Sequence, residues 1–101
     1  MLYRIESILH SGTKGERNTP RIDGRYPLRV GRIVDMEVYD VAPGYPMFID
    51  YVKDENGNDY TGMLVTSLVK DIYPATEELF TVETNNSIWT FRKVDSNETD
   101  I

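Results

Sequence analysis

Apolar and polar residues alternate along much of this chain, and a period of two is typical of β-strands with one buried face. The clearest case is the segment 78–94, where two runs rich in β-branched and aromatic residues flank Asn85-Asn86. Asparagine tolerates the positive φ angles that a tight hairpin turn requires. The segment therefore predicts a hairpin, with Trp89 and Phe91 on its core face because aromatic side chains dominate core burial.

The same pattern predicts strands in the rest of the chain. The expected strands occupy residues 2–9, 28–41, 47–53, 60–66 and 70–73. Asn56-Gly57 is a strong hairpin signal between the third and fourth of these. A short 3₁₀ turn is expected at 67–69, and one helical turn is expected at 74–78, where Pro74 stands at an allowed first position.

Successive short strands without a convincing long helix predict an all-β fold. The expected architecture is a small SH3-like or partly open β-barrel of about five to seven strands, with a long basic loop after the first strand. An OB-type barrel is the alternative, although such barrels usually carry a helix in mid-chain. Residues 1–94 are expected to form a single barrel domain, and residues 95–101 a polar C-terminal tail.

Composition excludes several classes of protein. The chain has 101 residues and no cysteine, which rules out disulfides and thiolate metal sites. No apolar run reaches the roughly 18 residues of a membrane-spanning helix. The N-terminal residues lack the pattern of a secretory signal, so a cytoplasmic location is expected.

Charge is distributed unevenly along the chain. The formal net charge is −6, yet residues 11–32 hold six positive and two acidic side chains, a net of +4. From residue 33 onward four positive side chains face fourteen acids, a net of −10. The segment 11–27 has few apolar residues and is expected to be a long loop or a mobile arm. Such an asymmetry indicates distinct surfaces rather than a fold.

The basic run supplies the first set of candidate binding residues: Lys14, Arg17, Arg21, Arg25, Arg29 and Arg32. The arginines follow one another at spacings of four, four, four and three, but Pro20 and Pro27 exclude a continuous helix. Guanidinium groups suit carboxylates and phosphates alike. Three interpretations stay open: pairing with the domain's own acids, binding of nucleic acid or a nucleotide, and binding of an acidic protein surface.

The acidic side chains expected to face solvent form the second set: Asp35, Glu37, Asp40, Asp50, Asp54, Glu55 and Asp59. Four of them, Asp35, Glu37, Asp54 and Glu55, join the candidate binding residues. Solvated acids usually provide only solubility. A dense acidic face can also imitate the phosphate spacing of nucleic acid and occupy a basic groove on a partner.

Other motifs carry weaker chemistry. His10 is the only histidine, has no adjacent nucleophile signature and is expected at the surface of a strand end. The oxygen-rich segment 54–59 lacks the spacing of a calcium loop. The segment 11–15 could wrap a phosphate with its backbone amides and Lys14, although no helix follows it. We therefore expect no catalytic residue, no metal and no cofactor.

The C-terminal third carries a resemblance. Thr66, Ser67 and Val69 form a T-S-x-V stretch, and a second stretch follows at residues 84–91 with Thr84, Asn86, Ser87, Trp89 and Phe91. The arrangement resembles small β-rich accessory proteins of bacteriophages and mobile elements of Gram-positive bacteria. The resemblance implies an accessory gene product, and anti-defence proteins, including anti-CRISPR proteins, are drawn from such genes.

Together these observations predict a non-enzymatic binding module. Its expected partner is a host protein such as a defence nuclease, which it would inhibit or modulate; a protein–nucleic-acid complex is the other expected partner. The alternative is a binder of nucleotides, small phosphate ligands or nucleic acid that uses the loop 11–32. Direct nucleic-acid binding would be weak because the net charge is negative. The module is expected to be a monomer or a homodimer.

Overall fold

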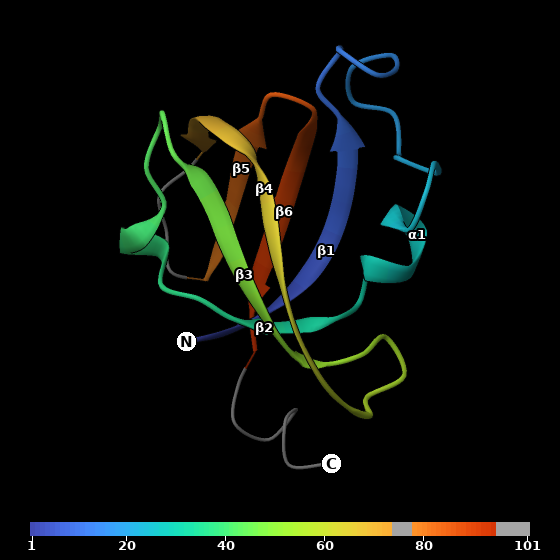
Figure 1. Ribbon diagram of the computed structural model, residues 1–101, viewed down its shortest axis with the longest axis vertical. Coiled ribbons are helices and arrows are strands. Elements are labelled where there is room, and N and C mark those ends of the chain that lie inside the picture. The colour runs from blue at the N-terminus through green and yellow to red at the C-terminus, as the bar shows by residue number, and fades with distance from the viewer. Residues whose placement is uncertain (74–77, 95–101) are drawn as a thin grey trace.

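The computed structural model describes residues 1–73 and 78–94, which form a ring of six antiparallel strands (Figure 1). The elements, in chain order, are β1 (Leu2–His10), α1 (Tyr26–Arg29), β2 (Ile33–Asp35), the 3₁₀ turn η1 (Val38–Asp40), β3 (Pro46–Lys53), β4 (Asp59–Tyr73), β5 (Leu79–Thr84) and β6 (Ser87–Lys93). The prediction of an all-β fold with five to seven strands is confirmed.

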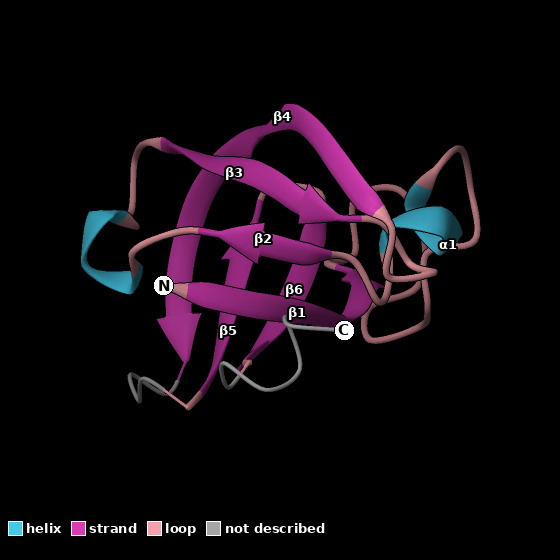
Figure 2. Ribbon diagram, turned by 90° about the horizontal axis from the view of Figure 1, so that it is seen from below, coloured by secondary structure: helices cyan, strands magenta, loops and turns pink. Residues whose placement is uncertain are grey.

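Each strand pairs with its neighbours in sequence, and β6 returns to pair with β1, so the sheet closes into a barrel. The closing seam runs from Tyr3 opposite Lys93 to His10 opposite Ser87. Closure leaves no free sheet edge along this seam, which removes a template for aggregation. Figure 2 shows the two helical turns, η1 and α1, on opposite sides of the barrel.

The core is filled by side chains from all six strands. The members that are almost fully buried include Tyr3, Ile5, Val34, Met47, Ile49, Phe80, Val82, Trp89 and Phe91. The rings of Phe80 and Phe91 stack at 5.2 Å, and Tyr3 meets Phe80 edge-on at 5.0 Å. The expected core positions of Trp89 and Phe91 are confirmed, at 2 % and 0 % exposure.

The strand expected over 28–41 is largely wrong. Only Ile33–Asp35 is a strand, because the chain before it turns through α1 and then meets the middle of β1 at Ile5. Gly31 enables this approach: its φ is 94°, in the region that favours glycine, and its amide donates to the Ile5 carbonyl at 2.8 Å. Burial still alternates beyond the strand, with Met36 buried and Glu37 exposed.

The 3₁₀ turn expected at 67–69 is also wrong. Strand β4 runs without a break through this segment for 15 residues. Its first part pairs with β3 as far as Leu68, and its second part pairs with β5 from Val69. The register shifts after Val69, so one bent strand serves two neighbours where the sequence predicted two separate segments.

The two predicted hairpins are present. Residues 54–58 connect β3 to β4, with Gly57 at a φ of 85°, and Asn85 and Asn86 connect β5 to β6. The expected positive φ at these asparagines is wrong, because Asn18 is the one non-glycine residue with positive φ in the described ranges. Residues 74–77 of the expected helical turn and the expected tail, 95–101, lie outside the described residues.

Candidate binding surfaces

The basic segment after β1 is held against the barrel by backbone hydrogen bonds. The Asn18 amide donates to the His10 carbonyl at 2.9 Å, and the His10 amide donates to the Thr19 carbonyl at 2.8 Å. Further on, the Arg21 amide donates to the Ile8 carbonyl at 2.9 Å. These bonds continue the β1 pairing outside the sheet, so residues 11–25 form an ordered loop, which we call the flap, and not the mobile arm considered from the sequence.

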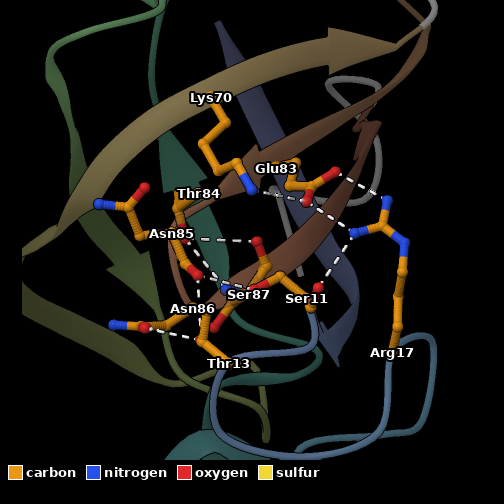
Figure 3. A network of polar contacts seen from close by, with 9 residues as sticks. All are labelled: Ser11, Thr13, Arg17, Lys70, Glu83, Thr84, Asn85, Asn86 and Ser87. Atoms are coloured by element: carbon orange, nitrogen blue, oxygen red, sulfur yellow. Dashed lines mark hydrogen bonds and ion pairs between the residues drawn. The ribbon is translucent and has the colours of Figure 1, made fainter.

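The flap is tied to the barrel by a buried carboxylate (Figure 3). The two guanidinium nitrogens of Arg17 donate to the two carboxylate oxygens of Glu83 at 2.7 and 2.9 Å. One of these nitrogens also donates to the Ser11 carbonyl at 3.0 Å, and Lys70 Nζ lies 3.7 Å from Glu83. The Glu83 side chain is only 5 % exposed. The Arg17 hydrogen bonds lower the pKa of Glu83 against the opposing effect of burial.

Hydroxyl groups fasten the start of the flap to the β5–β6 turn. Ser11 Oγ and Thr13 Oγ1 donate to the Asn85 carbonyl at 2.8 and 3.0 Å, as Figure 3 shows. The turn itself is closed by the Ser87 amide, which donates to Thr84 Oγ1 at 3.2 Å. The glycine-containing segment 11–15, considered above as a phosphate cradle, thus uses these polar groups within the fold.

Arg21 and His10 are buried beneath the flap. Arg21 is 6 % exposed, and it donates to Asp23 Oδ1 at 3.1 Å and to Ser87 Oγ at 2.8 Å. Its guanidinium also stacks on the Tyr26 ring, 3.9 Å from the centroid. The pKa of Asp23 is lowered chiefly by the hydrogen bond from Arg21. The surface position expected for His10 is wrong: the residue is 9 % exposed, because Gly15 packs against its ring.

The remaining basic candidates divide into two groups. Arg32 Nε donates to Glu55 at 3.1 Å, and its guanidinium lies 4.9 Å from the Tyr51 ring and 4.8 Å from the Tyr60 ring. By contrast, no described carboxylate pairs with the side chains of Lys14, Arg25 and Arg29. Pairing with the domain's own acids, one of the three interpretations, therefore applies to Arg17, Arg21 and Arg32.

The acidic candidates also separate. Asp54 and Glu55 serve the β3–β4 turn, where the Asp54 carboxylate accepts from the Asn56 and Asn58 amides at 2.9 Å and Glu55 accepts from Arg32. Asp59 pairs with Lys53 at 2.8 Å, which lowers the pKa of Asp59. These three acids therefore lie outside the cluster that the other four acidic candidates form.

The other four acids converge around a surface hollow of about 410 Å³ between η1 and β3. Asp35, Glu37, Asp40 and Asp50 line it together with Met36, Val41, Pro46, Met47 and Phe48. The N-terminal amine of Met1 pairs with Asp35 at 3.1 Å and with Glu37 at 2.7 Å. Asp40 and Asp50 have no ion-pair partner in the described part of the chain, so their carboxylates face solvent beside Phe48.

Sequence reasoning missed an apolar strip next to this hollow. Phe48 lies opposite Val65 in the β3–β4 pairing, and Asp50 lies opposite Met63. The exposed fractions are 57 % for Phe48, 61 % for Met63, 48 % for Val65 and 47 % for Leu68. Neighbouring exposed apolar side chains are a mark of interaction sites. The alternation along 47–53 and 60–66 was the available signal, because it places Phe48, Met63 and Val65 on the outer face of the sheet, away from the core.

No family model, curated protein or solved structure matches this chain. The resemblance to phage and mobile-element accessory proteins therefore stays a prediction. Within the described ranges, no group of three or more histidine, cysteine or acidic side chains is arranged to hold a metal ion. The helices found there are all too short and too polar to cross a membrane.

Proposed function

We propose that this protein is a non-enzymatic module that binds a basic surface on a partner protein and blocks it. The contact would be made by the acidic-apolar face, defined as Asp35, Glu37, Asp40, Asp50, Phe48, Met63, Val65 and Leu68. The observation that carries the proposal is the position of unpaired carboxylates beside exposed apolar side chains on one side of a closed barrel.

The chemistry of this face favours a cationic partner. Asp40 and Asp50 can accept hydrogen bonds from lysine or arginine side chains, while Phe48, which lines the same hollow, supplies an apolar anchor. Binding energy at protein interfaces is concentrated in a few buried apolar and charged groups surrounded by less important contacts. A partner with arginine or lysine side chains around an apolar patch would meet both requirements.

The fold supports this choice of face over the basic flap. Arg17 and Arg21 are engaged with Glu83 and Asp23, so their guanidinium groups act in the architecture of the domain. A protein that docked on these arginines would have to break those pairs. The acidic-apolar face needs no such rearrangement, because Asp50 and Phe48 already face solvent.

A narrower form of the proposal rests on the sequence resemblance alone. If the chain is an accessory protein of a bacteriophage or mobile element, its partner would be a host defence nuclease. The basic nucleic-acid groove of such an enzyme would accept the carboxylates in place of phosphates. This anti-CRISPR-like role specifies the class of the partner, and it involves the same residues of the acidic-apolar face.

The test compares the wild-type protein with a face variant and a matched control in capture from bacterial lysate at about 0.15 M salt. The face variant is Phe48→Ala with Asp50→Asn, and the control is Ile22→Ala, which truncates a side chain that is 81 % exposed on the flap. We expect one basic protein to be retained by the wild type and the control but lost with the face variant. Titration with the purified partner should then saturate.

Two results would remove the proposal. One is the absence of any saturable protein partner under these conditions. The other is a partner whose affinity is the same for the face variant and the wild type, which would place the contact elsewhere. Clear turnover of a substrate by the purified chain would separately remove its non-enzymatic part.

A further inference from the structure

A second surface hollow, of about 180 Å³, lies between α1 and the β3–β4 hairpin. Three guanidinium-bearing residues and two aromatic residues line it: Arg25, Arg29, Arg32, Tyr51 and Tyr60, with Gly62, Met63 and Leu64 completing the wall. We call it the arginine hollow. It lies on the α1 side of the barrel, whereas the acidic hollow lies on the η1 side (Figures 1 and 2).

We propose that the arginine hollow binds the phosphate group of a nucleotide-sized ligand. The site needs no partner protein, and Met63 is the one residue that it shares with the acidic-apolar face. The first support is uncompensated charge. Arg25 and Arg29 have no carboxylate partner among the described residues, while Glu55 compensates Arg32. The hollow therefore carries two positive charges, which match a phosphate dianion.

The second support is the way in which the guanidinium groups are held. Arg29 lies over the Tyr26 ring at 4.7 Å, and Arg32 lies over both Tyr51 and Tyr60. A guanidinium that stacks on an aromatic ring keeps its N–H donors free in its own plane. Stacking also limits the freedom of these long side chains, so less entropy is lost when they bind an anion.

The third support is space. A volume of about 180 Å³ equals the share of roughly six liquid water molecules, which accommodates a phosphate group and the start of its substituent. Gly62 keeps this space open because it has no side chain, and its φ of 153° is one that other residues rarely adopt. Tyr60, a residue that is 37 % exposed, offers a ring on which a base can stack.

The experiment titrates the full chain with three probes at about 50 mM salt: adenosine monophosphate, inorganic phosphate and adenosine. Binding is followed by calorimetry and by backbone amide shifts in NMR spectra. We expect the monophosphate to saturate with a dissociation constant of about 1 mM or lower. Inorganic phosphate should bind at the same site more weakly, and adenosine should bind weakest.

Variants decide whether the hollow is responsible. Arg25→Gln removes an exposed cation whose side chain makes no ion pair with the described residues, and it should weaken monophosphate binding about tenfold. Lys14→Gln makes the same charge change on the flap and should change the affinity less than twofold. Phe48→Ala alters the acidic-apolar face and should have no effect, which separates this site from the proposed protein interface.

Several outcomes would overturn the proposal. Equal losses for Arg25→Gln and Lys14→Gln would show general charge attraction only. A dissociation constant for adenosine equal to that for the monophosphate would show that the phosphate group is not recognised. No saturation by the monophosphate or phosphate below about 10 mM would leave the hollow without the proposed ligand. Binding confined to single-stranded oligonucleotides would likewise exclude a mononucleotide site.

Discussion

The Arg17–Glu83 pair allows a prediction about which half of an ion pair is more costly to remove. Glu83 is buried, whereas the Arg17 side chain is half exposed. Glu83→Gln leaves behind an arginine that water can solvate again. Arg17→Met leaves behind a buried carboxylate for which Lys70, at 3.7 Å, is the one remaining cation among the described residues. A buried charge without its partner is strongly destabilising. We therefore expect Arg17→Met to lower stability more than Glu83→Gln.

The magnitude for Glu83→Gln follows from its two hydrogen bonds, at 2.7 and 2.9 Å. A charge-assisted hydrogen bond contributes about 1.5–3 kcal/mol to stability, and a neutral one about 1 kcal/mol. Glu83→Gln loses this charge assistance but no longer has to bury a carboxylate. We therefore expect the unfolding free energy to fall by about 1–2 kcal/mol. For a domain of this size that free energy corresponds to a fall in Tm of roughly 5–15 °C.

The assay is urea unfolding followed by the fluorescence of Trp89, the only tryptophan, which is buried in the core. Both variants and the double variant, Arg17→Met with Glu83→Gln, are compared at neutral pH. The double variant has no buried carboxylate at position 83, so it should be more stable than Arg17→Met alone. An Arg17→Met protein that is as stable as Glu83→Gln, or more stable, would refute the reasoning.

The pH dependence gives an independent check on the same pair. The pKa of Glu83 in the folded protein is lowered, chiefly by its hydrogen bonds to Arg17. The pair therefore stabilises the fold fully above the unfolded-state pKa of about 4.3, and this stabilisation is lost as the pH falls through the lower folded-state pKa. The difference in unfolding free energy between the wild type and Glu83→Gln should narrow below pH about 4. A difference that stays constant from neutral pH to pH 2 would contradict this assignment.

Three further predictions concern packing. A methyl group at position 15 would lie 2.8 Å from ring atoms of the buried His10, so Gly15→Ala should destabilise the fold by about 1–3 kcal/mol, and His10→Ala in the same chain should remove most of this added cost in urea unfolding. Phe80→Ala, at a fully buried position, should cost about 3–5 kcal/mol. Phe48→Ala, on the exposed strip, should change stability by less than about 0.5 kcal/mol. A large loss at Phe48 would mean that this side chain serves the core and not a contact surface.

The strands that sequence predicted well are those whose alternation is reinforced by a local turn. Residues 47–53 carry Met47, Ile49 and Tyr51 inward, and the Asn56-Gly57 turn fixes where that strand ends. Residues 78–94 behave similarly around the Asn85-Asn86 turn. In both cases the hydrophobic face and the chain reversal are encoded within a few neighbouring residues, so no distant contact is needed to place them.

The failures occur where distant contacts decide the backbone. The alternation at 33–38 is real, yet the strand ends at Asp35 because β2 has to bridge β1 and β3 only over a short stretch. A buried coil and a buried strand share the same apolar pattern there, so periodicity could not separate them. Likewise, the continuity of β4 through Ser67 depends on pairing with both β3 and β5.

In the candidate sites, too, the sequence predicted what neighbouring residues encode and missed what distant contacts decide. The sequence identified the basic and acidic groups, but it could not show that Arg17 has a buried partner in Glu83, 66 residues away. It could not show either that Asp50 converges with Asp35, since the register of the β2–β3 pairing is what places these two residues opposite each other. The exposed strip at Phe48 and Met63 was within reach of the alternation pattern, because outward positions follow once the core face is known.

Charge placement on the barrel has a consequence for how a basic partner would approach. The flap and the η1 turn, which borders the acidic hollow, lie on opposite sides of the molecule in Figure 1, and the extent of the molecule across that view is 28 Å. At physiological ionic strength the screening length is about 8 Å, so the two charged regions act largely independently. A basic surface is then attracted to Asp40 and Asp50 and repelled by Arg25 and Lys14, which orients the encounter before contact. Added salt should slow association with such a partner but leave the apolar contact at Phe48, and therefore most of the dissociation rate, unchanged.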